Sequence, residues 1–444
     1  MSDPKRRYPA PVRLVLRGLQ EAKKVYYSVA KLYVHQLFRS VFEEDITAWK
    51  PDVVHTHDGM SLPLGVAAAK RNGARMVFDS HELEAHRNPP LTPRQRASVE
   101  RIEQRYLPQA DAVTTVGQKI ADHLKKQYGI SRPRVIYNSP PQTARSLPQK
   151  WQQPKRGSLR VEADFPDDAI VLVYTGNITM NRGVEQTLDG MAHYLKRPDA
   201  VQNIRLSLVG QTRPEIFQAV NERAQKLGLQ NHIHFHNPVS PTAVVDFISE
   251  GDIAVIPVIP VALSYDYAMP NKLFESMLAG LPILGARLAE MAPFIEEHNL
   301  GVCYDPLSPQ GFADGLAQLL RSGKAPRLSD ARKLELAGQF SWEAQEVVLR
   351  EVYQDLDIPA RTLRVAMVVP NPCNPDYRVV KQAESLANDG HSVCVFCTRA
   401  AGSGLPDKET INGVEYRRLD WSVRTAANSF FIFHLQKLGL VRRK

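Results

Sequence analysis

Short apolar runs alternate along the chain with longer segments in which apolar residues recur every three or four positions. Residues 74–80, 169–175 and 204–210 are such runs, and each is closed by glycine or by polar residues. Runs of this kind are typical of strands in a buried parallel sheet, and the periodic segments are typical of amphipathic helices. The alternation predicts an α/β protein with doubly wound sheets, in which ligands bind at the carboxyl ends of the strands.

Residues 264–284 contain the clearest helix signals. Pro270 has a preset φ and suits the first turn of a helix. Gly280 can adopt the left-handed conformation that ends a helix, and Pro282 prevents its continuation. The apolar side chains between them share one face at helical spacing: Leu273, Phe274, Met277 and Leu278. This stretch predicts a loop, a short helix and a strand.

Polar residues gather at the start of this predicted helix. Asn271 and Lys272 lie where free backbone N–H groups and the helix dipole favour an anion, so they predict a diphosphate site. Glu275, one turn further, is suited to accept hydrogen bonds from a ribose. The alternative is a surface helix in which Lys272 and Glu275 form an ordinary i,i+3 pair.

A second glycine-containing loop follows the run at 169–175. Gly176 lets the backbone approach a ligand, Arg182 supplies a planar cation suited to phosphate, and Gly210 ends the next strand. The loop is not G-x-G-x-x-G, which disfavours dinucleotide binding of the Rossmann type.

In the first third of the chain, polar residues follow two predicted strands. They are His57, Asp58, Asp79, His81 and Glu82. Their clustering at carboxyl ends predicts a second part of the site. A di-histidine metal site at His55 and His57 is the alternative, but no third ligand is defined by the spacing.

The segment PNKLFESMLAGLPIL resembles the donor-site helix of family-four retaining glycosyltransferases, which have the GT-B fold. The resemblance extends through PDVVHTHD, VFDSHE, ADAVTTV and VIYNSPP, and to FSWEAQEVVLREVYQDL, which is similar to the family's final helix. In that family two glutamates bind the nucleotide sugar. Glu275 matches the second, whereas the first falls at Tyr267, beside Asp266.

The same resemblance assigns further roles. A histidine at the position of His81 faces the donor sugar, and backbone near Val239 meets the base. Arg182 and Gly183 stand where the family has Lys-Gly, and Asn177 replaces an arginine that contacts phosphate.

Residues 362–444 resemble the opening of a family-four enzyme, which the start of this chain lacks. We therefore expect a circular permutation, with the strand 364–369 beside the strand 52–55. An orphan half-domain from a tandem pair is the alternative, although it would expose apolar sheet faces. The loop 370–378 would then lie at the cleft between two lobes. Its candidate residues are Asn371, Asp376 and Arg378, of which the last two could instead pair with each other.

The expected organisation has five parts. Residues 1–145 form the later part of an acceptor-side Rossmann-like domain, and 146–168, rich in Pro and Gln, form a linker. Residues 169–340 form the nucleotide-sugar domain, 341–361 a crossover helix, and 362–444 the first strands and helix of the acceptor-side domain.

Composition narrows the remaining choices. The 444 residues include 43% hydrophobic and 23% charged residues, which is typical of a globular protein large enough for two domains. No apolar run approaches the ~20 residues that span a bilayer, and no signal sequence is evident, so a cytoplasmic protein is expected. Four cysteines are too few for a disulfide framework, and the C-x-x-C at Cys394 and Cys397 reads as part of a buried strand.

The formal net charge of +9 is compatible with an anionic surface or substrate, and the chain has no nucleic-acid-binding signature. Residues 10–48 predict a helix, either packed on a sheet or, because Lys23, Lys24 and Lys31 flank apolar positions, lying at a membrane surface. A lipid-linked acceptor at the inner face of the membrane would suit this charge.

These observations predict a glycosyltransferase that moves a sugar from a UDP- or GDP-sugar to an acceptor hydroxyl in envelope polysaccharide or glycolipid synthesis. By the resemblance it is retaining; no D-x-D acidic pair is placed to hold a metal, and no cofactor is expected. The candidate catalytic residues are His81 and Asp58. The candidate donor-binding residues are Gly176, Arg182, Gly210, Val239, Asn271, Lys272 and Glu275. A nucleotide-sugar epimerase, using Asp58, Asp79 and Glu82, and an inactive scaffold remain as alternatives.

Overall fold

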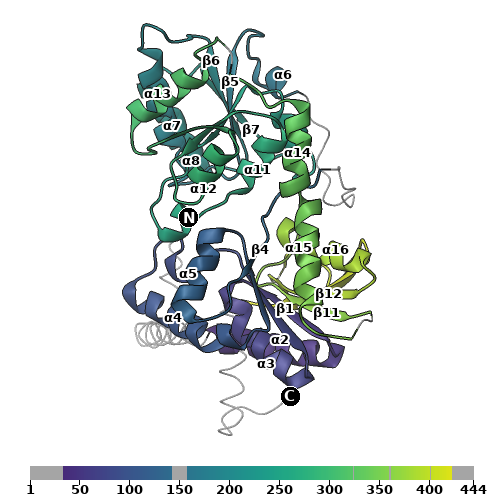
Figure 1. Ribbon diagram of the computed structural model, residues 1–444. Helices are drawn as coiled ribbons and strands as arrows, with labels where there is room; N and C mark the ends of the chain where they lie inside the picture. The colour runs from purple at the N-terminus through teal and green to yellow at the C-terminus, as the bar shows by residue number, and fades with distance from the viewer. Residues whose placement is uncertain (1–33, 143–157, 324, 360–361, 401, 423–444) are drawn as a thin grey trace, which may run out of the picture. The chain divides into compact units, whose positions relative to one another are not determined.

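The computed structural model describes residues 34–142, 158–323, 325–359, 362–400 and 402–422 (Figure 1). They form two compact units. The first unit contains the described parts of residues 1–78 and 361–444, and the second contains those of residues 79–360. Parallel strands alternating with helices build both, as the alternation of apolar runs predicts. The expected domain boundaries stay a prediction.

The sheet of the first unit joins strands from both ends of the chain. Their order is β13-β14-β12-β11-β1-β2. β14, β12, β11 and β1 pair parallel to one another, and β13 pairs antiparallel with β14. The strand bounds are β1 Val53–His57, β2 Arg75–Ser80, β11 Arg364–Val368, β12 Ser392–Arg399, β13 Lys408–Ile411 and β14 Val414–Asp420.

The expected pairing of the C-terminal strand with β1 is confirmed. β11 lies parallel to β1, with Val53 opposite Val365 and Thr56 opposite Val368. All four of these residues are buried. β11 begins at the exposed Arg364, whose guanidinium lies over the Trp49 ring, 4.3 Å from its centre. The C-terminal segment is therefore part of this sheet and not an orphan half-domain. The circular permutation itself stays a prediction.

In the described part of the first unit, three helices accompany the sheet: α2 Val34–Trp49, α3 Asp58–Asn72 and α16 Tyr377–Asn388. The described part of the predicted helix 10–48 is α2, and its apolar face is fully buried at Phe38, Phe42 and Ile46. This packing favours an ordinary core helix for residues 34–49. Lys23, Lys24 and Lys31 lie outside the described residues.

The C-x-x-C pair lies on β12 and is part of the hydrophobic core. Cys394 and Cys397 are free thiols without exposed surface. Burial raises the pKa of both thiols, that of Cys397 to about 12, so they stay protonated and unreactive near neutral pH. The buried-strand interpretation is confirmed.

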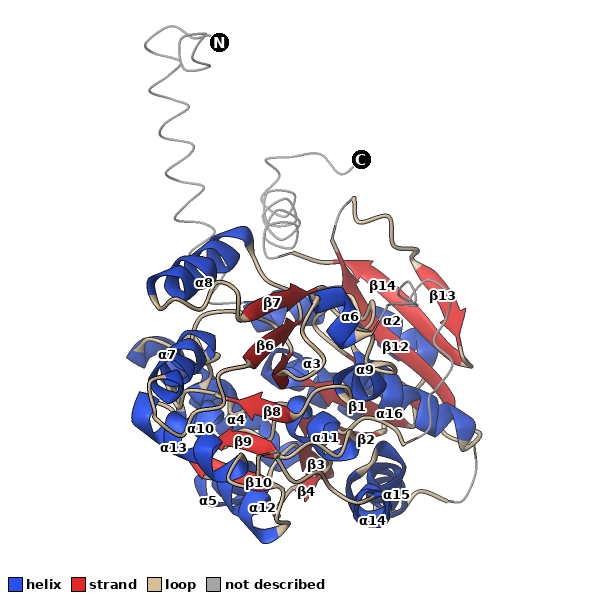
Figure 2. Ribbon diagram, turned by 90° about the horizontal axis from the view of Figure 1, so that it is seen from above, coloured by secondary structure: helices blue, strands red, loops and turns tan. Residues whose placement is uncertain are grey.

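The second unit contains a six-stranded parallel sheet in the order β10-β9-β8-β5-β6-β7, seen edge-on in Figure 2. The strand bounds are β5 Ile170–Thr175, β6 Ile204–Val209, β7 Ile233–His236, β8 Ile253–Ile256, β9 Ile283–Ala286 and β10 Gly301–Tyr304. This unit also contains β3 Ala112–Thr115 and β4 Arg134–Val135, which pair parallel to each other.

Side chains of β5 alternate between two apolar cores. Leu172 and Tyr174 point into one with α7 and α13, and Val171 and Val173 point into the other with α9 and α11. Both faces of β5 are therefore buried, which explains why its sequence is apolar at nearly every position.

Helices of the second unit flank these strands. They are α4 Pro93–Tyr106, α5 Gln118–Tyr128, α6 Leu159–Ala163, α7 Val184–Leu195, α8 Pro214–Lys226, α9 Val244–Ile248, α10 Leu263–Asp266, α11 Asn271–Leu278, α12 Met291–Glu297, α13 Pro309–Leu319, α14 Asp330–Phe340 and α15 Trp342–Gln354, with short 3-10 turns at η2 Glu84–His86 and η3 Leu107–Gln109. Helices α8, α10, α12 and α14 were not predicted.

Part of the predicted linker packs onto the second unit. Residues 159–163 form α6, and Leu159 is fully buried in the core that contains α11. The Arg160 guanidinium donates to the Asp252 carboxylate at 2.7 Å. The polar composition of 146–168 did not reveal this anchoring, because its contacts, among them hydrogen bonds from Arg160 to the carbonyl oxygens of Glu250 and Ala169, are to residues outside the segment.

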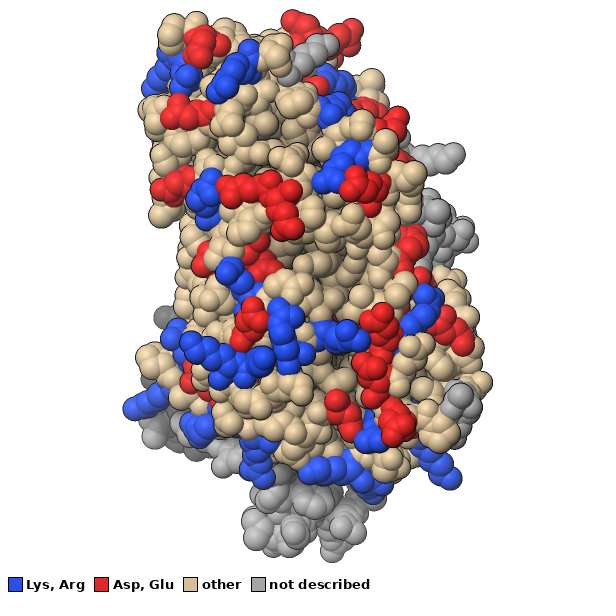
Figure 3. Space-filling view, viewed as in Figure 1, with Lys and Arg blue, Asp and Glu red and all other residues tan. Residues whose placement is uncertain are grey.

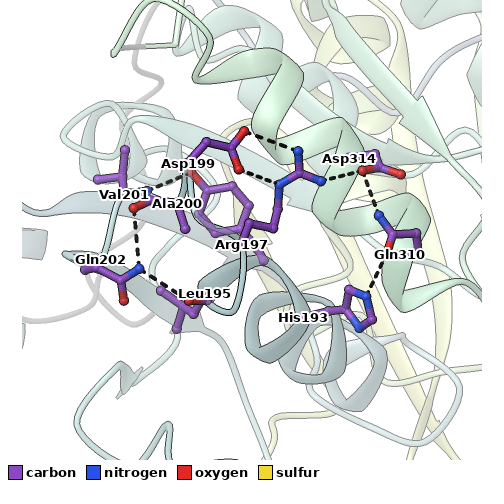
Figure 4. A network of polar contacts seen from close by, with 10 residues as sticks. His193, Leu195, Arg197, Asp199, Ala200, Val201, Gln202, Gln310 and Asp314 are labelled. Carbon is purple, nitrogen blue, oxygen red and sulfur yellow. Dashed lines mark hydrogen bonds and ion pairs between the residues drawn. The ribbon is translucent and has the colours of Figure 1, made fainter.

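A polar network joins the end of α7 to α13 (Figure 4). The Arg197 guanidinium donates to Asp199 at 3.0 Å and to Asp314 at 2.6 Å, and Gln310 links Asp314 to His193. Because these groups are exposed, the ion pairs contribute little to stability. The network orients the outer helices and lies away from the strand ends that carry the candidate site.

Candidate functional site

Two glycines bring the loops after β5 and β6 together. A Cβ on Gly210 would lie 2.0 Å from the carbonyl oxygen of Gly176, so only glycine fits there. Gly176 itself has φ 102°, a conformation that strains any other residue. The predicted glycine loop is therefore an open, side-chain-free surface at the carboxyl end of the sheet.

Lys272 lies beside this surface. It is the second residue of α11 and only 7% exposed, with its Nζ 3.6 Å from the centre of the Tyr174 ring. A Cβ placed on Gly176 would lie 3.7 Å from that Nζ. Among the described residues, no carboxylate forms an ion pair with Lys272, so the surface-pair alternative with Glu275 is not supported.

Burial, together with the positive charge of Arg182, lowers the pKa of Lys272 to about 7, although Glu275 opposes the shift. A buried ammonium beside a second cation is unfavourable unless an anion is bound. The local electrostatics therefore favour a negatively charged ligand at this position.

Arg182 is held by an aromatic ring instead of an acid. Its guanidinium carbon lies 5.0 Å from the centre of the Tyr265 ring, and its buried Nε has no hydrogen-bond partner among the described residues. The Tyr265 hydroxyl accepts a hydrogen bond from Asn88 Nδ2 at 3.2 Å. Stacking leaves the N–H donors of Arg182 available, which suits phosphate recognition.

Glu275 lies one turn into α11, where its Oε2 accepts a hydrogen bond from the Thr175 hydroxyl at 3.1 Å. Asn271 is the exposed first residue of α11, and Pro270 forms the N-cap without a side-chain hydrogen bond. Gly280 has φ 72° after the helix, as its predicted role requires. Because no side chain caps α11, the N–H groups of its first turn lie next to Lys272 without a capping side chain.

Asp266 does not substitute for the first glutamate of the family. Its Oδ1 accepts a hydrogen bond from the backbone N of Ala289 at 2.9 Å, so it holds the loop before α12. The neighbouring Tyr267 ring faces the His123 ring, with 6.4 Å between centres. The position of the first glutamate is neutral in this chain.

His81 follows β2 and is oriented by Asp79. Its Nε2 lies 3.1 Å from Asp79 Oδ2, and the Thr114 hydroxyl donates to Asp79 Oδ1 at 2.9 Å. Asp79 therefore fixes the orientation of the His81 imidazole. Asp79 stood in the predicted cluster, but its orienting role becomes visible only in the structure.

The remaining candidates, Asp58, the pair His55 and His57, and Val239, lie among residues of the fold. Asp58 begins α3 in the first unit with φ 63°, and the rings of His55 and His57 stack there at 4.6 Å. Val239 is half-buried and packs on the core around α11. The catalytic role of Asp58, the base contact near Val239 and the metal alternative at the histidines stay predictions.

In the predicted cleft loop, Asp376 is the N-cap of α16. Its carboxylate accepts hydrogen bonds from the backbone N of Arg378 at 3.3 Å and from Asn371 Nδ2 at 2.8 Å. Asp376 therefore contacts the backbone of Arg378, and no ion pair joins the two side chains within the described residues. Donor contact by these three residues stays a prediction.

Several residues of the cationic site were not predicted: Tyr174, Thr175, Tyr265 and Asn88. Tyr174 and Thr175 precede Gly176 directly, so their place at the strand end was a usable signal. Asn88 is 177 residues from Tyr265, and only the tertiary structure brings them together.

The two parallel α/β domains and the glycine-lined cationic site are those of the GT-B class. Solved structures that are less than 25% identical to this chain support the fold alone. Sucrose-phosphate synthase from Thermosynechococcus elongatus has a TM-score of 0.58 and 17% identity, covering 72% of this chain and 77% of that one. Anabaena Alr3699/HepE in complex with UDP has a TM-score of 0.54 and 16% identity, covering 69% and 80%.

Sequence comparisons define the family. Residues 3–139 match the model described as Glycosyltransferase Family 4, and residues 169–322 match that described as Glycosyl transferases group 1. A D-inositol 3-phosphate glycosyltransferase 2 from Catenulispora acidiphila is 25% identical over 324 residues, covering 70% of this chain and 73% of the relative. A D-inositol 3-phosphate glycosyltransferase from Corynebacterium glutamicum is 24% identical, covering 68% and 72%.

The chain belongs to the family-four glycosyltransferases and is a transferase enzyme. The matched models and these relatives are all glycosyltransferases, which disfavours the epimerase and the inactive scaffold. Among the described residues, no helix has both the length and the apolar character needed to cross a bilayer.

Proposed function

We propose that this enzyme transfers a sugar from a nucleoside diphosphate to an acceptor hydroxyl. The observation that carries the proposal is the pairing of two cations without a carboxylate. Lys272 is buried next to Arg182, beside the side-chain-free surface at Gly176. A diphosphate supplies the missing negative charge, and the Anabaena structure in the same fold contains UDP.

In this proposal the cations stabilise the leaving group. Negative charge develops on the diphosphate as the glycosidic bond breaks, and fixed donors in a buried site stabilise that charge strongly. Lys272, Arg182 and the N-terminus of α11 at Asn271 provide those donors, which makes a metal ion unnecessary for neutralising it. Gly176 and Gly210 permit the backbone to approach the phosphates.

The other candidate residues bind the remaining groups of the donor, which are the ribose, the base and the sugar. Glu275 accepts hydrogen bonds from the ribose while Thr175 fixes its carboxylate, and backbone near Val239 meets the base. His81, oriented by Asp79, hydrogen-bonds the donor sugar. By family resemblance the acceptor attacks on the face of the leaving phosphate, so the sugar keeps its anomeric configuration.

A donor screen tests this function. The protein is incubated with labelled UDP- and GDP-sugars, with and without EDTA, and sugar release, transfer and anomeric configuration are measured. We expect turnover of one nucleotide sugar that EDTA leaves unchanged. Arg182→Ala and Lys272→Ala should each weaken nucleotide binding by tenfold or more, because each removes a charge-assisted contact. Lys226→Ala, on the exposed face of α8, is the matched control. Wild-type affinity in both site variants would remove the diphosphate assignment.

We further propose an acceptor carried on a lipid at the inner membrane surface, in envelope polysaccharide or glycolipid synthesis. Arg94, Arg101 and Arg105 recur at helical spacing on the exposed face of α4. None of the three forms an ion pair with another described residue, and basic side chains gather over α4 and α5 in Figure 3. An unneutralised basic face of this kind favours anionic headgroups.

Vesicle flotation tests the membrane part. We expect the full-length protein to float with phosphatidylglycerol vesicles at low salt and not with phosphatidylcholine vesicles. Replacing the three α4 arginines by glutamine should reduce flotation several-fold, whereas Arg223→Gln, whose arginine already pairs with Asp189, should not. Equal flotation of all variants would contradict this surface.

A further inference from the structure

The start of α5 holds a carboxylate from a distant part of the second unit. The backbone N–H groups of Gln118 and Lys119 donate to Glu290 Oε1 and Oε2, at 2.6 and 2.7 Å. Glu290 lies 172 residues further along the chain and is only 8% exposed. Both carboxylate oxygens are therefore used to satisfy two helix-terminal donors that α5 cannot satisfy itself.

Charge as well as hydrogen bonding makes this contact specific. α5 has 11 residues, and its N-cap Gly117 offers no capping side chain, so the Glu290 carboxylate is placed to balance the partial positive charge of this N-terminus. The approach is close, since a Cβ on Gly117 would lie 3.4 Å from Glu290 Oε1 and from the Tyr267 carbonyl oxygen. A glutamine in place of Glu290 would retain the size but offer only one acceptor oxygen and no charge.

The backbone around Glu290 is fixed in turn by α10. Asp266 at the end of α10 accepts hydrogen bonds from the backbone N of Ala289 through Oδ1, at 2.9 Å, and from that of Glu290 through its carbonyl oxygen, at 3.4 Å. α5 is thus connected to α10 by the Glu290 side chain and by the backbone of residues 289 and 290, which Asp266 holds.

α10 leads directly to the cationic site. Its Tyr265 stacks on Arg182, and four residues separate its end from α11, which begins with Asn271 and Lys272. A second contact, between Asn88 and the Tyr265 hydroxyl, ties the segment before α4 to the same helix. The segment 79–142 is thus attached at two points to the helix that supports Arg182.

We propose that Glu290 is a positioning residue that holds the start of α5 against α10 and so keeps the donor site in the arrangement required for transfer. The inference rests on the proposed function of that site. Glu290 makes no contact with Lys272 or Arg182 within the described residues; it acts through Asp266 and α10. Its loss should therefore reduce turnover more than nucleotide affinity.

The test compares full-length Glu290→Gln and Glu290→Ala with Glu296→Gln. Glu296 lies on α12, six residues away, and pairs with the exposed Arg287 at 2.7 Å, which makes it a matched control. UDP affinity is measured by calorimetry, kcat and KM by transfer assay, and amide hydrogen exchange at residues 118–119 by mass spectrometry. Hydrolysis of the donor without transfer is recorded as well.

For Glu290→Gln we expect UDP affinity within about twofold of wild type, kcat reduced tenfold or more, faster exchange at the start of α5, and a larger share of hydrolysis. Glu290→Ala should show the same changes, larger in size, and Glu296→Gln none of them. A wild-type kcat in Glu290→Gln would overturn the proposal, as would UDP affinity falling in parallel with kcat. If wild-type protein neither binds UDP or GDP nor turns over any donor, the proposed function fails instead, and the exchange measurement still reports whether Glu290 holds α5.

Discussion

Helices α11 and α16 both follow a loop at the carboxyl end of a parallel strand, yet their first turns are used differently. At α16 the Asp376 carboxylate accepts the backbone N–H of Arg378 and the amide of Asn371, so the start of the helix is closed by its own side chain. At α11 no side chain caps the helix, and Lys272 and Arg182 add positive charge beside it. A closed helix start contributes stability, whereas an open and cationic one creates a binding site.

The same distinction separates what mutations should do in the two units. Changes in the first unit around β11 and α16 should lower the free energy of unfolding and leave ligand affinity unchanged where the protein still folds. Changes around α11 should lower affinity and leave stability unchanged or improved, because the buried cations are unfavourable in the ligand-free protein.

Removal of residues 362–444 should have the largest effect. It deletes β11, β12, β13 and β14 and exposes the edge of β1 that pairs with β11. An open apolar edge favours aggregation, so we expect no soluble folded protein, as measured by soluble yield and circular dichroism. A soluble truncated protein that binds UDP as the full chain does would show that the C-terminal strands are dispensable.

Titration of Lys272 should make nucleotide affinity depend on pH. Its pKa of about 7 lies below the usual lysine value, and a bound diphosphate would raise it, so binding takes up a proton above pH 7. Affinity should then fall by up to tenfold per pH unit above about pH 7. Calorimetry in buffers of different ionisation enthalpy measures the uptake.

Lys272→Met is the control for that titration and sharpens it. The Lys272→Met variant should bind UDP weakly, without proton uptake, and its affinity should depend little on pH between pH 7 and 9. In the wild type without ligand, the unfolded chain binds a proton that the native state has lost, so stability should rise between pH 7 and 10. The variant should lack this rise in melting temperature, and a rise of the same size would contradict the assignment to Lys272.

Asp376→Ala should have a moderate effect, limited to stability. Loss of an N-cap costs about 0.5–2 kcal/mol, so we expect a lower urea midpoint with an unchanged slope. Asp376→Asn retains a capping oxygen and should recover most of the loss. UDP affinity should stay at the wild-type value in both variants; a decrease of tenfold would place Asp376 in the donor site after all.

Tyr265→Phe should have the smallest effect. It removes the hydroxyl that accepts from Asn88 but keeps the ring under Arg182. One net hydrogen bond corresponds to about 1 kcal/mol, so UDP affinity should fall less than tenfold. Tyr265→Ala, which also removes the ring, should weaken binding further, and equal affinities of the two variants would show that stacking does not hold Arg182.

Much of the fold was predictable from local pattern. The runs that became β5 and β6 are apolar at nearly every position, and Gly280 ends α11 in the left-handed conformation that its position suggested. Helices α8 and α14 were missed although each has an amphipathic sequence. Residues 159–163 of the predicted linker form α6, which local sequence did not reveal, since the burial of Leu159 depends on a core built by residues far along the chain.

The candidate site divides in the same way. The sequence was enough to name Arg182, Lys272 and the two glycines as site residues, because they occur in short motifs next to predicted strand ends. The roles of Tyr265, Asn88 and Asp79 could not, because an aromatic ring, an amide or a carboxylate has no distinctive spacing that shows which residue it will support. Asp376 was predicted as a cleft residue and is found as a helix cap, since both uses require the same residue type at the end of a strand.

The sequence by itself determined the class of this protein, the positions of its strands and the cations beside its glycine loops, because periodicity, glycine and charge act over a few residues. It also indicated that the last strands belong beside β1, since each unit must bury both faces of a parallel sheet. Only the tertiary structure decided which charges are neutralised: Asp376 by a neighbouring backbone, Glu290 by a helix 172 residues away, and Lys272 by no acid among the described residues. Neutralisation depends on distances of a few ångströms between remote segments, which local sequence does not specify.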